Sequence, residues 1–157
     1  MAFQLTLGNH RPLGADGSVV EPTLENVSFP SRTDRITLRG WLFKSPLPSG
    51  RSEIVVHGFQ QNRVNADFGG VALSKDLLAH GYDVLLIDFA PVATATAAVS
   101  PLANSNPAIC SALMTSCGRA HYLPPRLAVI GDREGAATVI GAARNLARVG
   151  VLMADSL

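Results

Sequence analysis

Two short apolar runs with an amphipathic segment between them constrain the fold of this chain most strongly. Residues 53–56 and 82–88 are rich in β-branched residues and leucine, and each has the length of a strand buried on both faces. Residues 67–80 carry a helical apolar stripe formed by Val71, Leu73, Leu77 and Leu78. Asp67 is a candidate N-cap for this helix and Gly81 is a stop signal. Strand, helix and strand at this spacing predict a βαβ unit, and therefore a parallel sheet.

The rest of the chain adds a hairpin and further strands. Residues 26–29 and 36–43 carry strand patterns on either side of a turn-rich segment, which predicts an antiparallel hairpin. Residues 127–130 and 149–154 are additional apolar runs, and residues 135–147 between them have helical character. We therefore predict an α/β fold in which an N-terminal antiparallel hairpin leads into a mostly parallel sheet with flanking helices.

The length and composition suit one domain with a hydrophobic core. The chain has 157 residues, of which 47% are hydrophobic. Residues 1–23 are polar and punctuated by glycine and proline, which predicts an irregular N-terminal arm, and residues 24–157 are predicted to form one partial domain. Within it, residues 90–125 are anomalous, because Arg119 is their only formally charged residue and no helical or strand period persists. We expect this segment to be irregular.

Charge and cysteine content bound the partners of the protein. A net charge of +1 gives no electrostatic reason to expect nucleic acid or an anionic membrane as a partner. Residues 1–12 lack the apolar core of a signal peptide, and no run is long and apolar enough to span a bilayer. Cys110 and Cys117 have no metal-ligand residues nearby, which favours two free thiols over a disulfide. We expect a cytoplasmic protein without a metal or cofactor.

The third apolar run leads into a turn enclosed by glycines. Gly131 and Gly135 flank Asp132, Arg133 and Glu134, and the helical segment follows. Strand, Gly-x-x-x-Gly turn and helix are the context of the G-x-S-x-G nucleophile elbow of α/β-hydrolases, in which the serine stands on a strained turn. Arg133 takes the position of that serine in this chain.

A polar loop after the first buried strand extends the resemblance. The loop consists of His57, Gly58, Phe59, Gln60, Gln61, Asn62 and Arg63. Asp88 ends the next strand, and the Gly-x-x-x-Gly turn follows the third. In this order the chain resembles the α/β-hydrolase superfamily, in particular the esterase-like and peptidase-like serine hydrolases with an H-G-x-x-x-N-R loop. The resemblance covers residues 25–88 and 127–156 and implies the amino-terminal part of an α/β-hydrolase fold.

The resemblance also implies which residues would form the site and which substrates it would take. The backbone N–H groups of Phe59 and Glu134 would stabilise an oxyanion, as donors of this kind do in acyl transfer. The loop and turn around them would be shaped by His57, Gly58, Gly131 and Gly135. Asn62 and Arg63 would tie the loop down, and an active member would take a small-molecule ester or amide as its substrate.

The nucleophile position is not competent for this chemistry. The guanidinium of Arg133 stays protonated at neutral pH and has no free lone pair to attack a carbonyl. The family order of nucleophile, acid and histidine places the last two beyond residue 157, so both are expected to be missing. Asp155 comes one strand too early for the acid, and His121 precedes the turn. These residues predict a hydrolase that ancestrally cleaved ester or amide bonds through an acyl-serine and is inactive as written.

Three alternatives remain open. The chain could be a non-catalytic remnant or binding module that keeps part of the fold, with self-association through an exposed sheet edge at residues 149–154. A nucleotide-binding α/β domain is the second alternative, although neither a G-x-G-x-x-G nor a P-loop motif is present. Members of the family continue after the aspartate that ends the second buried strand with a motif like R-G-H-G-x-S. The degenerate codons of residues 92–97 would allow this motif if they were read in a frame shifted by one base. The third alternative is therefore that residues 90–123 are a shifted-frame reading.

Overall fold

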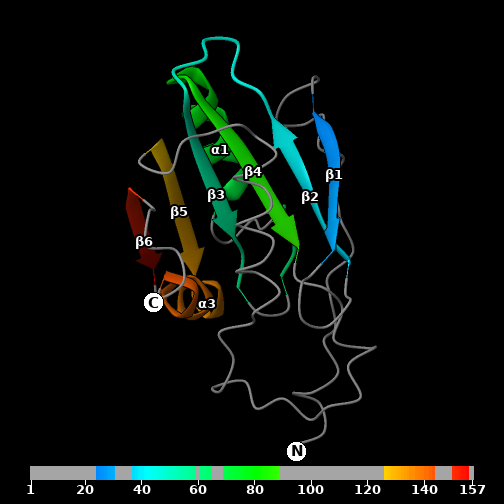
Figure 1. Cartoon of the computed structure of the whole chain (residues 1–157), viewed down its shortest axis with the longest axis vertical. Helices are drawn as coiled ribbons and strands as arrows, with labels where there is room; N and C mark the ends of the chain where they lie inside the picture. The colour runs from blue at the N-terminus through cyan, green and yellow to red at the C-terminus, as the bar shows by residue number, and fades with distance from the viewer. Residues whose placement is uncertain are drawn as a thin grey trace, which may run out of the picture.

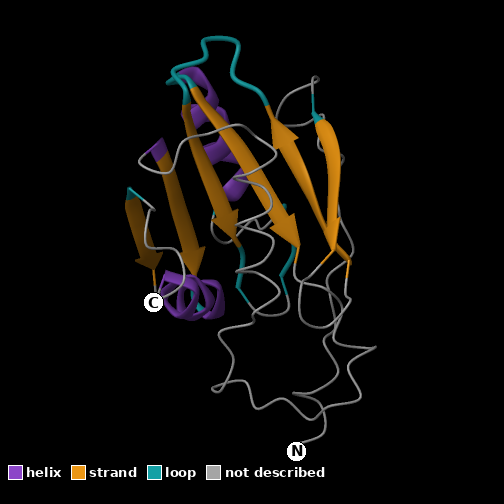
Figure 2. Ribbon diagram, in the orientation of Figure 1, coloured by secondary structure: helices purple, strands orange, loops and turns teal. Residues whose placement is uncertain are grey.

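The computed structural model describes residues 24–30, 37–58, 61–64, 69–88, 126–143 and 150–155. These residues form a six-stranded sheet accompanied by two helices (Figure 1, Figure 2). The predicted arm and the anomalous segment, with both cysteines, lie outside the described residues. Neither described helix is long and apolar enough to cross a membrane.

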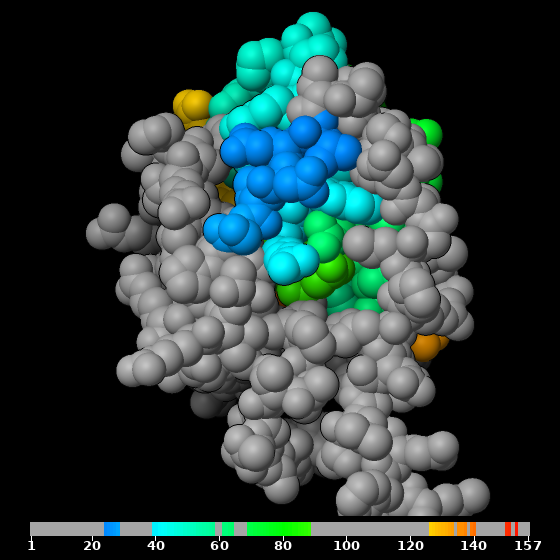
Figure 3. Space-filling view, turned by 90° about the vertical axis from the view of Figure 1, so that its right-hand side faces the viewer, coloured from blue at the N-terminus to red at the C-terminus, as the bar shows by residue number. Residues whose placement is uncertain are grey.

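The sheet has the hairpin and the parallel strands that the sequence predicts. Its elements are β1 (Glu25–Pro30), β2 (Thr37–Phe43), β3 (Arg51–Val56), α1 (Gly70–Ala79), β4 (Tyr82–Asp88), β5 (Leu127–Asp132), α3 (Glu134–Ala143) and β6 (Val151–Asp155). The strand order is β1-β2-β4-β3-β5-β6, and Figure 3 looks onto the β1 edge. The β1–β2 and β2–β4 pairs are antiparallel, whereas the β3–β4, β3–β5 and β5–β6 pairs are parallel.

A hydrophobic core cluster lies between the sheet and α1, which passes behind β3 and β4 in Figure 1. Its buried members are Trp41, Phe43, Val55, Leu78, Val84 and Leu86. Complete burial of a side chain of this size stabilises the fold by about 1.5–3 kcal/mol. The rings of Trp41 and Phe43 meet edge to face with their centroids 6.4 Å apart. Trp41 on β2 is therefore a core residue.

The predicted start of α1 is wrong, whereas its predicted end is confirmed. The helix begins at Gly70, and its N-cap is Gly69 in a left-handed conformation (φ 68°) without a side-chain cap hydrogen bond. Asp67, the predicted cap, lies outside the described residues. Gly81 follows the helix with φ 87°, and a Cβ there would lie 2.6 Å from the carbonyl oxygen of Leu47. Only glycine fits this turn, because it combines a positive φ with close backbone contact.

The strand β5 is longer than the apolar run predicts. It continues through Gly131 and Asp132, which pair with Val56 of β3 and Asp155 of β6, respectively. Because α3 begins at Glu134, the chain reverses over the single residue Arg133. Apolar periodicity does not detect this extension, since ladder pairing uses backbone groups that glycine and aspartate also carry.

The strand order places a topological switch point between β3 and β5. The chain passes from β3 through α1 to β4 on one side, and from β5 through α3 to β6 on the other. Ligand sites of open α/β sheets lie beyond the carboxyl ends of the strands at such a point. The segments that follow β3 and β5 are therefore where a site is expected.

Candidate active site

The loop after β3 and the turn after β5 meet at the switch point. The pairing of Val56 with Gly131 brings the next residues of both strands level with one another. A Cβ placed on Gly58 would lie 3.5 Å from the Cβ of Arg133 and 3.4 Å from the carbonyl oxygen of Asp132. The His-Gly segment and the glycine-flanked turn thus lie side by side at the ends of β3 and β5, as the sheet topology requires.

Arg133 has a strained backbone. Its φ is 49°, and it is the one non-glycine residue with a positive φ among the described residues. A left-handed conformation costs an L-residue about 1–2 kcal/mol, because Cβ crowds the following carbonyl oxygen. The strain has a local cause, since pairing holds β5 up to Asp132 and α3 starts at Glu134. A strained strand-to-helix turn of this kind is how α/β-hydrolases expose their nucleophile.

The two glycines that flank the turn permit backbone contacts that no side chain would allow. A Cβ on Gly131 would lie 2.6 Å from the carbonyl carbon and oxygen of Gly135. A Cβ on Gly135 would lie 2.5 Å from the carbonyl oxygen of Val56 and 2.6 Å from that of His57. Glycine is therefore required twice, to close the turn on itself and to seat the first turn of α3 against the end of β3.

One of the two predicted oxyanion donors lies in the described part of the chain. Glu134 is the first residue of α3, and the first N–H groups of a helix have no acceptor within it. The backbone hydrogen bonds of α3 begin with the N–H of Ala137, which donates to the carbonyl oxygen of Arg133 at 3.2 Å. The N–H of Glu134 thus lies directly after the nucleophile position. Phe59, the other predicted donor, lies outside the described residues.

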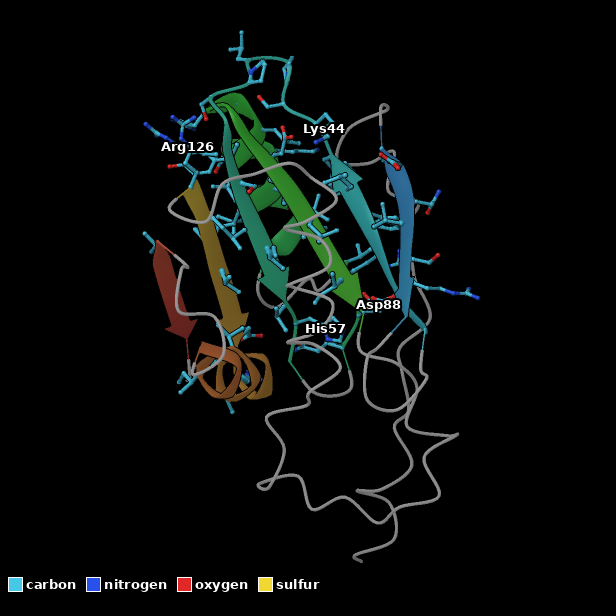
Figure 4. The ribbon with its side chains drawn as sticks, in the orientation of Figure 1. Lys44, His57, Asp88 and Arg126 are labelled. Carbon is cyan, nitrogen blue, oxygen red and sulfur yellow. The ribbon has the colours of Figure 1, made fainter. Side chains whose placement is uncertain are left out.

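Asp88 forms the centre of a polar cluster at the carboxyl end of β4. Its Oδ1 accepts a hydrogen bond from the backbone N–H of Arg63, and its Oδ2 accepts one from Arg63 Nε, both at 2.8 Å. The Nε2 atom of His57 lies 3.8 Å from Oδ1, and Figure 4 shows the two side chains together below the ends of β3 and β4. The guanidinium of Arg63 also stacks over the Trp41 ring, with Cζ 4.7 Å from its centroid.

The other polar side chains of the loop bond within the loop. The Oδ1 atom of Asn62 accepts a hydrogen bond from the N–H of Val64 at 2.9 Å, and Gln61 Oε1 accepts one from the N–H of Gly58 at 3.2 Å. His57 is 3% exposed, and its Nδ1 lies 2.7 Å from the carbonyl oxygen of Gly58. Because a carbonyl only accepts, Nδ1 is the donor of this contact. Both ring nitrogens of His57 therefore face groups other than solvent.

Sequence reasoning used Asp88 only as a marker of the order of strands and did not single out Glu53. Asp88 was noted as a strand end, but its contact with Arg63 becomes visible only when the sheet order makes β3 and β4 neighbours. Glu53 lies inside the apolar run of β3, is 4% exposed, and has no hydrogen-bond partner for its Oε1 atom. Burial raises the pKa of Glu53 from 4.5 to about 7.

No metal centre is indicated in the part of the chain that the structure describes, because it contains no group of three or more histidine, cysteine, aspartate or glutamate side chains suited to one ion. The polar groups at the switch point are a strained arginine, a helix N-terminus and a histidine-containing loop. These groups lie beyond the carboxyl ends of β3 and β5, where ligand sites of open α/β sheets are found.

Comparison with solved structures identifies the fold. The esterase Pf2001 of Pyrococcus furiosus matches with a TM-score of 0.73 and 19% identity, over 96% of this chain and 56% of that one. The α/β-hydrolase GrgF of Penicillium sp. sh18 matches with a TM-score of 0.63 and 22% identity, over 83% and 45%. Est1E of Butyrivibrio proteoclasticus matches with a TM-score of 0.55 and 17% identity, over 80% and 48%. Neither a protein-family model nor a curated protein sequence matches the chain.

These matches establish the fold at the level of architecture. The chain has an esterase-like partial α/β-hydrolase fold, which confirms the predicted fold class. It spans about half the length of the solved hydrolases that it matches, between 45% and 56% of those three.

Proposed function

We propose that this chain derives from a serine hydrolase of ester or amide bonds and that it forms no acyl-enzyme in its present form. The observation that carries the proposal is Arg133. The backbone of this residue has the strain expected of a nucleophile elbow, and its side chain has no nucleophilic atom. A polypeptide turn rarely keeps a strained arginine without a reason, and descent from a serine elbow supplies one.

The surroundings of the elbow support the same origin. Gly131 and Gly135 leave room for nothing larger than hydrogen, although neither contributes a side chain to chemistry. The N–H of Glu134 lies at the helix start, where a developing oxyanion would be stabilised by unpaired backbone donors and the helix dipole. Small-molecule esters and amides are the substrates that such a site accommodates.

Ester hydrolysis by three forms of the chain tests the proposal. The wild type, Arg133→Ser and Arg133→Gly would be assayed with p-nitrophenyl acetate and p-nitrophenyl butyrate. Arg133→Gly is the matched control, because it removes the bulk and the strain of arginine without supplying a nucleophile. The wild type and Arg133→Gly are expected to show only the background rate. Hydrolysis by the folded wild type, lost on denaturation, would overturn the proposal.

The serine variant separates the two candidate functions. A rate of ester hydrolysis by Arg133→Ser well above that of Arg133→Gly would mean that the protein supplies the other catalytic groups and that residue 133 alone prevents turnover. Folded but silent Arg133→Ser would favour the second candidate, a non-catalytic binding module that keeps the fold.

One observation favours that second candidate. Among the described strands β6 pairs only with β5, and its Val151 and Met153 side chains are 53% and 55% exposed. An edge strand with exposed apolar side chains pairs readily with another chain. Met153 is the middle residue of β6, so a two-fold antiparallel pairing of two β6 strands that is centred on this residue would place the two Met153 residues opposite each other. We therefore propose a second copy of this chain as the partner of a binding module.

A further inference from the structure

The loop between β3 and α1 has two described parts, residues 57–58 and 61–64, and each is held by contacts with the rest of the protein. His57 and Gly58 continue from the carboxyl end of β3, where a Cβ on Gly58 would lie 3.5 Å from the Cβ of Arg133. Gln61 to Val64 form the second described part, and Gln61 is linked back to Gly58 through its Oε1 atom. A displacement of the second part would therefore be passed to Gly58 and would change the position of Gly58 beside the elbow.

Asp88 holds the second part of the loop through Arg63. It binds this one residue through the backbone N–H and through the guanidinium, whose Nη2 forms an ion pair with Oδ2 in addition to the Nε hydrogen bond. Charge-assisted contacts of this kind are about twice as strong as neutral ones, and the two-point attachment fixes direction as well as distance. Because the backbone N–H is included, the contact fixes the path of the loop and not only a side chain.

The environment of Arg63 strengthens this contact. The side chain of Arg63 is 7% exposed, so solvent screens its interaction with Asp88 little. The guanidinium of Arg63 lies over the Trp41 ring, while its Nε and Nη2 atoms contact Asp88. Trp41 belongs to the core beneath α1, so the loop is tied to the hydrophobic core.

A second aspartate on β4, Asp83, forms a comparable ion pair away from the candidate site. Asp83 is 4% exposed, accepts a hydrogen bond from the N–H of Ser45 at 2.8 Å, and pairs with Lys44 Nζ at 2.8 Å. It combines a backbone N–H donor and a cation, as Asp88 does. Figure 4 places Lys44 at the opposite end of the sheet from His57 and Asp88. Asp83 is therefore a matched control for removing a buried carboxylate from this strand.

We propose that Asp88 is a positioning residue, which holds the two described parts of the loop, residues 57–58 and 61–64, in register with the elbow by clamping Arg63 against Trp41. The assignment of this loop to an acyl-transfer site rests on the proposed function, whereas the clamp itself does not. Loss of the Asp88 charge releases Arg63, and the loosened loop then lets Gly58 move away from Arg133. Loss of the Asp83 charge destabilises the opposite end of the sheet and leaves the loop in place.

Amide hydrogen exchange measured by NMR tests the clamp directly. Asp88→Asn is expected to speed exchange at the N–H groups of Gly58 and Arg63 by about tenfold or more, the size expected for losing charge-assisted hydrogen bonds. Asp83→Asn is expected to leave both rates within about twofold of the wild type, after correction for global stability. Equal effects of the two variants, or no effect of Asp88→Asn on Gly58, would overturn the proposal.

The fluorescence of Trp41 gives a second, independent readout, because it is the only tryptophan in the chain. Asp88→Asn is expected to change its emission maximum and its accessibility to iodide, whereas Asp83→Asn is not. If Asp88→Asn does not fold, Arg63→Lys carries the test. Lysine keeps the charge but loses the bidentate and stacked geometry, so the same changes at Gly58 and Trp41 are expected. An Arg63→Lys protein with wild-type exchange and emission would contradict the clamp.

Activity distinguishes failure of this proposal from failure of the proposed function. If Arg133→Ser hydrolyses esters, adding Asp88→Asn is expected to lower kcat by about tenfold or more with a smaller change in KM, because misplacement near the reacting atoms costs rate before binding. Adding Asp83→Asn is expected to leave both constants unchanged. An inactive Arg133→Ser would count against the intact site, while the exchange rates of Gly58 would still decide whether Asp88 clamps the loop.

Discussion

Glu53 makes the stability of this protein depend on pH near neutrality. Burial raises its pKa from 4.5 to about 7, and its Oε1 atom has no hydrogen-bond partner. The folded state therefore binds this proton more tightly than the unfolded state does. The resulting stabilisation is fully present below pH 4.5 and is lost as pH rises through about 7. At about 1.4 kcal/mol per pKa unit, the shift corresponds to a loss of about 3 kcal/mol.

The comparison of wild type with Glu53→Gln isolates this effect, because glutamine has a similar shape and cannot ionise. Urea unfolding of both proteins at pH 5 and pH 8 gives the free energy of unfolding at each pH. The wild type is expected to lose about 2–3 kcal/mol relative to Glu53→Gln between these values, since the folded pKa lies between them and only a small part of the loss precedes pH 5. Glu25→Gln, at an exposed position on β1, controls for the loss of one carboxylate. Equal pH dependence in wild type and Glu53→Gln would refute the reasoning.

Three further predictions concern the elbow and the sheet edge. Arg133→Gly is expected to raise the free energy of unfolding by about 0.5–1 kcal/mol in urea titrations, because relief of the left-handed backbone exceeds the entropic cost of glycine; a loss of stability would contradict this. Gly135→Ala is expected to destabilise by about 2 kcal/mol or more, since its Cβ would lie 2.5 Å from a backbone oxygen, and Gly69→Ala by less, because nothing lies within 4 Å. Equal losses in calorimetry would count against that explanation. Met153→Lys on β6 is expected to abolish concentration-dependent association in light scattering. Leu47→Lys, at a loop position that is 68% exposed, is expected to leave association unchanged.

The sequence predicted the architecture where hydrophobic patterns are unambiguous. The runs in β3 and β4 are buried almost throughout, and their pattern with a helix between them predicted the parallel pair correctly. Boundaries were predicted less well, because backbone pairing extends beyond apolar side chains. This is why β3 begins two residues before Glu53, the predicted start, and why β5 continues to Asp132.

The candidate site was predictable as far as its elements are local in sequence. The spacing of Gly131 and Gly135 identified the turn, and the structure adds the strain at Arg133, which depends on where β5 and α3 end. The contact between Asp88 and Arg63 could not be predicted locally, because it joins residues 25 positions apart through the pairing of two strands. The burial of Glu53, whose Oε1 atom has no hydrogen-bond partner, likewise depends on which elements cover β3.

Reaction with a fluorophosphonate tests the central claim most directly, namely that the elbow is built but carries no nucleophile. Such reagents phosphonylate an activated serine at an elbow and have no acceptor on a guanidinium. Intact-mass measurement of the folded wild type is expected to show no adduct, and peptide mapping none in residues 131–135. A stoichiometric adduct on the folded wild type that disappears when the protein is denatured before treatment would contradict the account.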